Sequence, residues 1–108
     1  MSWSALARAE LSAGRSVSVR PRGNSMQPLI KSGASVCLQP LTDAETDALA
    51  VGDIVFVKVK GRWYLHRVSA VDKRRVQIAN ARGRVNGWAQ RRAVLGILVD
   101  AQAKRQKS

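Results

Sequence analysis

Short runs of apolar residues alternate with polar or charged positions along most of the chain, and this pattern predicts β-strands. The clearest signal lies at 51–72, where two segments rich in Val and aromatic residues flank Lys60-Gly61 and predict a hairpin. Similar runs, bounded by Pro, Gly or charged turns, predict further strands at 15–21, 34–40, 74–80 and 93–99.

A different spacing occupies the first residues. Trp3, Ala7 and Leu11 recur at helical intervals, Ser2 or Ser4 can cap the start, and Gly14 can end a helix over 3–13. The remaining segments predict no regular element: 23–33 is expected to be a turn followed by a short coil or helical piece, and the acidic segment 41–50 an exposed loop. The segment 81–88 is also expected to be a loop, which Trp88 packs onto the domain.

Many short strands joined by close turns favour a mainly β fold: a coiled or barrel-like, mostly antiparallel β domain with a short N-terminal helix. The predicted organisation is a helix at 1–14, a β domain at 15–100 and a basic flexible tail at 101–108. A chain of 108 residues suits one hydrophobic core and is too short for two domains.

The composition excludes several kinds of site. A single cysteine rules out an intramolecular disulfide, and a single histidine rules out paired-histidine metal motifs, so no metal or cofactor is expected. No apolar run approaches the ~20 residues that span a bilayer, and the first residues lack the positive leading region of a signal peptide. The sequence therefore predicts a cytoplasmic protein without a transmembrane anchor.

Charge is distributed unevenly. Residues 1–54 hold five basic and five acidic side chains, whereas residues 55–108 hold fourteen basic and two acidic ones, which gives the whole net charge of +12. Such a half could bind nucleic acid or an acidic protein, or its charges could simply be solvated turns. The candidate patch for such a partner is Lys73, Arg74, Arg75, Arg82, Arg84, Arg91 and Arg92.

The sequence GNSMQP at 23–28 carries the candidate nucleophile, Ser25. A serine hydroxyl attacks a carbonyl only when a base takes its proton and N–H donors await the oxyanion. Gly23 permits a close backbone approach, Asn24 and Met26 flank the serine, and N–H groups of such a turn could point at the reacting oxygen. Taken alone, the segment is a weak signal, and an ordinary turn whose serine bonds to its own backbone is the favoured interpretation.

His66 is the one side chain whose ordinary pKa suits a general base near neutral pH. A lone histidine on a strand can also be merely structural. Asp53 is the nearest candidate for a supporting acid, although a turn or strand-entry role explains it as well. Lys58, in the preceding strand, is a second conceivable base.

The order of these segments resembles the superfamily of signal peptidases and LexA-like self-cleaving repressors. Ser25 in GNSMQP matches the Gly-x-Ser-Met-x-Pro segment of the nucleophile, and Gly52 and Asp53 match a Gly-Asp-Ile-Val strand. His66, just before Arg67, matches the base, as in archaeal and endoplasmic-reticulum signal peptidases. The resemblance covers roughly 16–99 and implies a coiled, mostly antiparallel β fold with a Ser25–His66 dyad that cleaves peptide bonds.

The chain also departs from that superfamily. A Gly-Asp-Asn box often follows the base strand there, whereas the corresponding region here has Asn80 and no Asp. Ala13-Gly14 looks like a self-cleavage bond but lies close before Ser25 and is interpreted as a helix end. We therefore expect a small serine endopeptidase that cleaves a specific protein or itself. The alternative is a non-catalytic module of the same fold that binds nucleic acid or an acidic protein.

Overall fold

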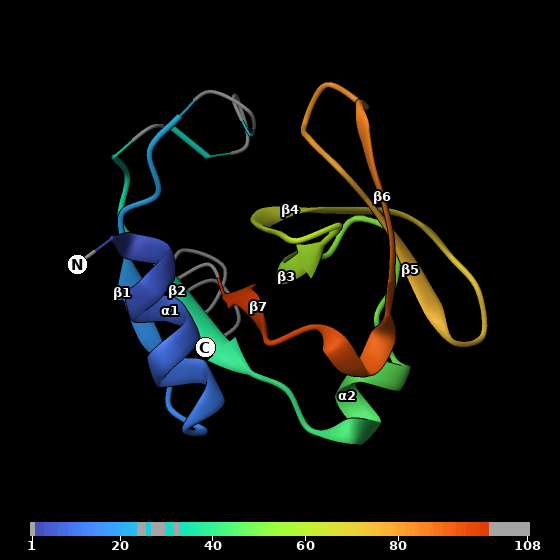
Figure 1. Ribbon diagram of the computed structural model, residues 1–108, viewed down its shortest axis with the longest axis horizontal. Coiled ribbons are helices and arrows are strands. Elements are labelled where there is room, and N and C mark those ends of the chain that lie inside the picture. Colours follow the sequence, from blue (N-terminus) through green and yellow to red (C-terminus); the bar gives the residue numbers. More distant parts are fainter. Residues whose placement is uncertain (1, 24–25, 27–29, 32, 100–108) are drawn as a thin grey trace, which may run out of the picture.

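The computed structural model describes residues 2–23, 26, 30–31 and 33–99, which form a seven-stranded antiparallel sheet with a short helix at the start (Figure 1). The strands follow one another in space in the order β1-β2-β7-β3-β4-β5-β6. The elements are α1 (Trp3–Ser12), β1 (Val17–Val19), β2 (Val36–Pro40), α2 (Asp43–Asp47), β3 (Ile54–Val59), β4 (Arg62–Val71), β5 (Arg75–Ala79), β6 (Val85–Gln90), the 3₁₀ turn η1 (Arg91–Ala93) and β7 (Gly96–Val99). The predicted fold class, mainly β with an N-terminal helix, is confirmed.

The hairpin of β3 and β4 forms the centre of this sheet. Its turn lies at Lys60-Gly61, as predicted, and both residues have positive φ angles, 51° and 83°, which is the backbone of the tight turns that suit twisted hairpins. Alternate residues of β3 point to opposite faces, so Val55, Val57 and Val59 are buried on one face and Phe56 on the other.

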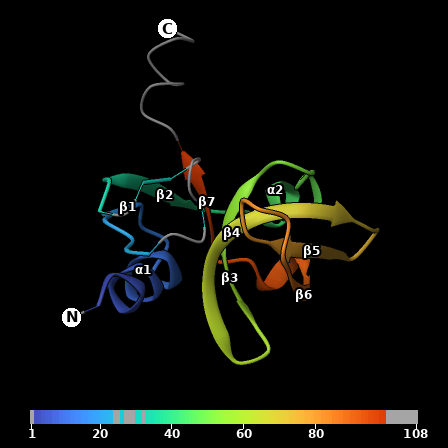
Figure 2. The ribbon, with the colours of Figure 1, turned by 90° about the horizontal axis from the view of Figure 1, so that it is seen from above.

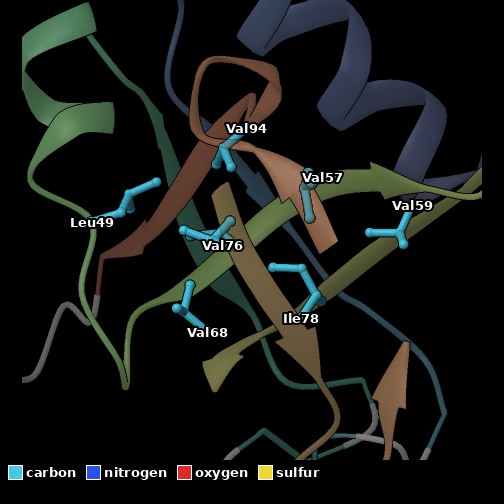
Figure 3. Packing of buried hydrophobic residues seen from close by; sticks show 9 residues of the cluster. Leu49, Val57, Val59, Val68, Val76, Ile78 and Val94 are labelled. Carbon is cyan, nitrogen blue, oxygen red and sulfur yellow. The ribbon is translucent and has the colours of Figure 1, made fainter. Parts of the chain in front are cut away.

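Two hydrophobic clusters lie on these two faces. The first contains Val55, Val57 and Val59 and is enclosed by the curled strands β3–β6 together with Leu49 and Val94 (Figure 3). The second contains Phe56 and lies where α1, β1 and β2 cover the sheet. Seen from above, α1, β1 and β2 lie on one side of β7 and strands β3–β6 on the other (Figure 2).

The first helix confirms the sequence prediction closely. The hydroxyl of Ser2 accepts a hydrogen bond from the backbone N–H of Ala5, and the helix ends at Ser12, so the predicted helix at 1–14 is found as Trp3–Ser12. Ala7 and Leu11 are buried against the sheet. The strands of the predicted β domain lie between residues 17 and 99, and residues 101–108, predicted as a tail, lie outside the described residues.

The predicted loop at 41–50 is wrong in part, because Asp43–Asp47 form the helix α2. The hydroxyl of Thr42 accepts from the N–H of Glu45, and the Glu45 carboxylate accepts from the N–H of Thr42. This reciprocal capping box stabilises the first turn of even a short helix. Among the described residues, no helix is long and apolar enough to cross a membrane.

The predicted loop at 81–88 is also wrong in its second half, since β6 begins at Val85 and pairs with β5. Gly87 explains why a turn-like sequence forms a strand here. A Cβ atom at Gly87 would lie 2.9 Å from Cγ1 of Val59, so glycine allows β6 to curl back against the end of β3. Trp88 does not pack onto the domain as predicted: it is exposed, and the Arg75 guanidinium lies 4.7 Å from its ring centroid.

Candidate active site

His66 lies in the middle of β4 and is buried, with 6% of its surface exposed. It pairs with Val55 of β3, so its side chain is on the face of the first hydrophobic cluster. The Tyr64 ring, two residues earlier on the same face, lies 4.8 Å from the imidazole between ring centroids. The sheet therefore holds the imidazole in an enclosed, mostly apolar environment.

The Nδ1 atom of His66 lies 2.6 Å from Oδ1 of Asn86. An amide oxygen can only accept a hydrogen bond, so Nδ1 carries the proton and donates it to Asn86. In the neutral ring, Nε2 then carries the lone pair, which is the tautomer that a general base requires. Strand β6 brings Asn86 to this position across β5, twenty residues along the chain from His66.

Asn86 is the site residue that sequence reasoning missed. Asn86 falls within 81–88, which was expected to be a loop, and Asp53 was the expected supporting acid for His66. In the structure the Asp53 carboxylate instead accepts the backbone N–H of Ala50 at 2.9 Å, and the position beside Nδ1 belongs to Asn86. This hydrogen bond closes the turn that leads into β3, so the Asp53 carboxylate has a structural role. The one available signal was the polar Asn86 followed by Gly87 in an otherwise strand-like segment.

Two effects act on the pKa of His66, and they oppose each other. Burial disfavours the charged imidazolium and lowers the pKa below its ordinary value, and this effect is the larger. The hydrogen bond to Asn86 favours the imidazolium and raises the pKa. Because burial prevails, the imidazole is neutral at pH 7 and able to accept a proton.

The predicted nucleophile Ser25 and its neighbour Asn24 lie outside the described residues. The described residues on either side, Gly23 and Met26, line a small cavity of about 40 Å³ together with Leu65, the residue before His66. Met26 is buried in the second hydrophobic cluster, which also contains Leu65. Met26 therefore packs on the Leu65 face of β4, which is opposite to the face that carries the His66 side chain, and Gly23 is exposed.

Lys58, the other conceivable base, lies on the opposite face of β3 from Val55, the residue that pairs with His66. Its side chain is exposed and its strand partner is Trp63. This environment does not remove water from the ammonium group, so nothing here prepares it for a base role.

The seven basic residues predicted as one patch do not form one. Arg91 is buried, and its guanidinium donates to four backbone carbonyls, those of Thr46, Asp47, Leu49 and Asp72. Arg75 pairs with Asp72, and Arg92 with Asp43 and Asp47.

The remaining four members divide between the two ends of β5. Lys73 and Arg74 line a shallow hollow beside the β4–β5 turn, with Gln90. Arg82 and Arg84 lie in the β5–β6 turn. In the part of the chain that the structure describes, no three His, Cys, Asp or Glu side chains gather as a metal site would require.

No family model, no curated protein sequence and no solved structure matches this chain.

Proposed function

We propose that the protein is a serine endopeptidase in which Ser25 is the nucleophile and His66 the general base. The observation that carries this proposal is the Nδ1–Asn86 hydrogen bond, which orients a buried, neutral imidazole with its basic nitrogen at Nε2. The burial of Met26 in the cluster that contains Leu65 supports it, because it holds the residue after Ser25 beside β4. The resemblance to signal peptidases and LexA-like repressors adds the matching motifs.

In the proposed reaction, Nε2 of His66 takes the Ser25 hydroxyl proton while the oxygen attacks a peptide carbonyl. Backbone N–H groups near Ser25 would bind the oxyanion. The imidazolium then gives its proton to the departing amine, which leaves an acyl-enzyme. A water molecule, deprotonated by the same imidazole, attacks the acyl carbonyl, and its proton passes back to Ser25 as the acid product leaves.

Asn86 would keep Nδ1 protonated throughout these steps. Because its amide is uncharged, it fixes the ring as a carboxylate would but attracts the imidazolium less strongly. We therefore propose a slower enzyme than one with an aspartate here, and one whose base stays unprotonated to lower pH.

A separate protein is the favoured substrate. The Ala13-Gly14 bond, which looks like a self-cleavage site, ends α1: the Ala13 N–H donates to the carbonyls of Ala9 and Glu10, and the Gly14 N–H to that of Leu11. An extended peptide conformation, which peptidases usually require, would break these hydrogen bonds. Cleavage of the protein's own chain at this bond is therefore not part of the proposal.

A fluorophosphonate probe tests the proposal, because it reacts with activated serines. We expect labelling of the unaltered protein, no labelling of Ser25→Ala, and labelling slowed by about 10²–10⁴ in His66→Gln. Ser35→Ala, which removes an exposed serine elsewhere, is the matched control and should label normally. Circular dichroism should give the same spectrum for all four proteins. Labelling that neither Ser25→Ala nor His66→Gln changes would refute the peptidase and favour the non-catalytic binding module.

A further inference from the structure

We infer that the candidate active site selects peptides with acidic side chains near the cleaved bond, through a rim of five cations. This arginine-rich rim is defined as Arg22 and Lys31 on one side and Arg67, Arg82 and Arg84 on the other. The inference rests on the proposed peptidase function and names the chemistry of its substrate.

The β5–β6 turn gives the rim a fixed shape. The side-chain oxygen of Asn80 accepts the backbone N–H groups of Arg82 at 3.0 Å and Arg84 at 2.9 Å. The Nε atom of Arg67 donates to the carbonyl of Asn80 at 3.1 Å, so a third guanidinium is tied to the same turn. Because these hydrogen bonds use the backbone, the exposed side chains of Arg82 and Arg84 remain available for a ligand.

This turn is directly connected to the candidate site. Arg84 precedes Asn86, the partner of His66, by two residues, and Arg67, whose side chain lies on the face of β4 opposite to that of His66, is tied to the turn through Asn80. On the other side, Arg22 and Lys31 line the cavity with Gly23 and Met26. The β5–β6 turn and the described parts of 20–33 lie at the same end of the molecule, and α2 lies at the opposite end (Figure 1).

Acidic side chains do not neutralise the rim. The described acids already have partners elsewhere: Glu10 with Arg15, Asp43 and Asp47 with Arg92, Asp72 with Arg75, Glu45 in the cap of α2 and Asp53 on the N–H of Ala50. Within the described residues, none of the five rim cations has a carboxylate at ion-pair distance. The rim cations therefore carry positive charge that no described carboxylate compensates, and Arg84 is two residues from Asn86, the partner of His66.

An acidic peptide fits this rim better than a nucleic acid does. Proteins that bind single-stranded nucleic acid commonly combine basic side chains with aromatic ones on which bases stack, and the turn at 80–84 has no aromatic residue. The exposed Trp88 ring on β6 is already covered on one face by the Arg75 guanidinium. Carboxylates along an extended peptide, by contrast, are suitable partners for guanidinium groups spaced along a turn.

The test measures how well peptides protect Ser25 from the fluorophosphonate probe. Two ten-residue peptides are compared, one with four Glu residues and one with Gln at the same positions. We expect the Glu peptide to halve the labelling rate at a concentration about tenfold lower than the Gln peptide, the effect of two exposed charge pairs. This difference should vanish at 0.5 M NaCl and in the Arg82→Gln/Arg84→Gln variant, and persist in Lys73→Gln/Arg74→Gln, the matched control at the other end of β5.

Equal protection by both peptides, or equal loss in both double variants, would overturn the inference while the peptidase proposal stands. Absence of any Ser25-dependent labelling would refute the peptidase itself. Binding of the two fluorescein-labelled peptides, measured by anisotropy, then tests the rim without the peptidase. Tighter binding of the Glu peptide that is lost in Arg82→Gln/Arg84→Gln would support the rim as an acidic-peptide site, and equal binding of both peptides would overturn the inference. Tighter binding of a ten-nucleotide oligothymidylate, abolished by the same two substitutions, would identify nucleic acid as the ligand and overturn the inference.

Discussion

At the scale of single residues, the pKa of His66 determines when the candidate base can work. Burial holds this pKa below the ordinary histidine value, so the imidazole is neutral at pH 7 and becomes protonated only as pH falls below that ordinary value. We predict that the fluorophosphonate labelling rate is flat around pH 7 and has its acid midpoint below 6.5. A rate profile between pH 4.5 and 8.5 checks this. An acid midpoint above 6.5 would mean that a nearby negative charge, and not burial, controls the ring.

Asn86 should control both the position of the ring and that midpoint. In Asn86→Ala the hydrogen bond that raises the His66 pKa is lost, so the acid midpoint should move further down and the rate fall by about 10–100-fold as the ring loses its orientation. In Asn86→Asp a carboxylate faces the imidazolium, so the midpoint should move up. The same pH–rate profiles measure both variants. Identical midpoints in all three proteins would show that Asn86 does not act on His66.

The site residues differ in whether they could be predicted from the sequence. Ser25 and His66 could be proposed because each stands in a local motif whose order along the chain is informative. Asn86 could not, because its role depends on the pairing of β6 with β5 and on the curl that brings β6 over β4. Asp53 was proposed because it opens the strand that precedes His66 in the hairpin, but its carboxylate already accepts the N–H of Ala50 in its own turn.

At the scale of elements, Arg91 connects η1 to α2. Its buried guanidinium donates to the carbonyls of Thr46 and Asp47 at the end of α2, to that of Leu49 just beyond the helix, and to that of Asp72. We predict that Arg91→Ala lowers the free energy of unfolding by about 2–4 kcal/mol, because several buried carbonyls lose their donor. Urea denaturation measures it. Arg92→Ala, which removes exposed ion pairs with Asp43 and Asp47, is the control and should cost under about 1 kcal/mol. Equal losses would contradict the structural role of Arg91.

Gly87 is the position where β6 can close against the central hairpin. Its φ angle is 146°, which residues with a Cβ rarely adopt, and a Cβ there would meet Cγ1 of Val59 at 2.9 Å. We predict that Gly87→Ala destabilises the fold by about 2–4 kcal/mol and disturbs the His66 imidazole signals in NMR spectra, because Asn86 is adjacent. Gly83→Ala, with φ of 92° and its nearest atom at 4.0 Å, should cost about 1–2 kcal/mol and leave those signals in place. Unchanged imidazole signals in Gly87→Ala would show that the packing of β6 against β3 does not control the position of His66.

Elements that are determined by residues close in the sequence could be predicted more readily than an element that depends on a distant contact. The β3–β4 hairpin was predictable because Lys60-Gly61 fixes its turn locally. Helix α2 had a local cause as well, the Thr42–Glu45 capping box, but the acidic composition of the segment suggested a loop. Strand β6 could not be predicted locally, since Gly87 has turn chemistry and only the approach of Val59 explains it as a strand residue.

At the scale of the whole molecule, β3 connects the two hydrophobic clusters. Val55 and Val57 belong to the cluster inside the curled strands and Phe56 to the one beneath α1. The candidate site uses both faces of the same hairpin: His66 lies on the face of the first cluster, and Leu65, with Met26, belongs to the second. The hairpin at the centre of the fold therefore also carries His66, the candidate base.

The net charge of +12 should make stability depend on salt. The protein measures 31 × 30 × 28 Å, and at 0.01 M ionic strength the screening length is about 30 Å, so most of its charges repel one another. At 1 M the screening length falls to about 3 Å and this repulsion disappears, while the ion pairs of the described residues are exposed and contribute little.

We predict that Tm rises by about 4–8 °C between these NaCl concentrations, equivalent to about 1 kcal/mol, as measured by circular dichroism. Lys73→Gln/Arg74→Gln lowers the net charge from +12 to +10 and should show a smaller rise. A Tm that falls with added NaCl would mean that surface ion pairs, and not repulsion between like charges, dominate the electrostatics of this fold.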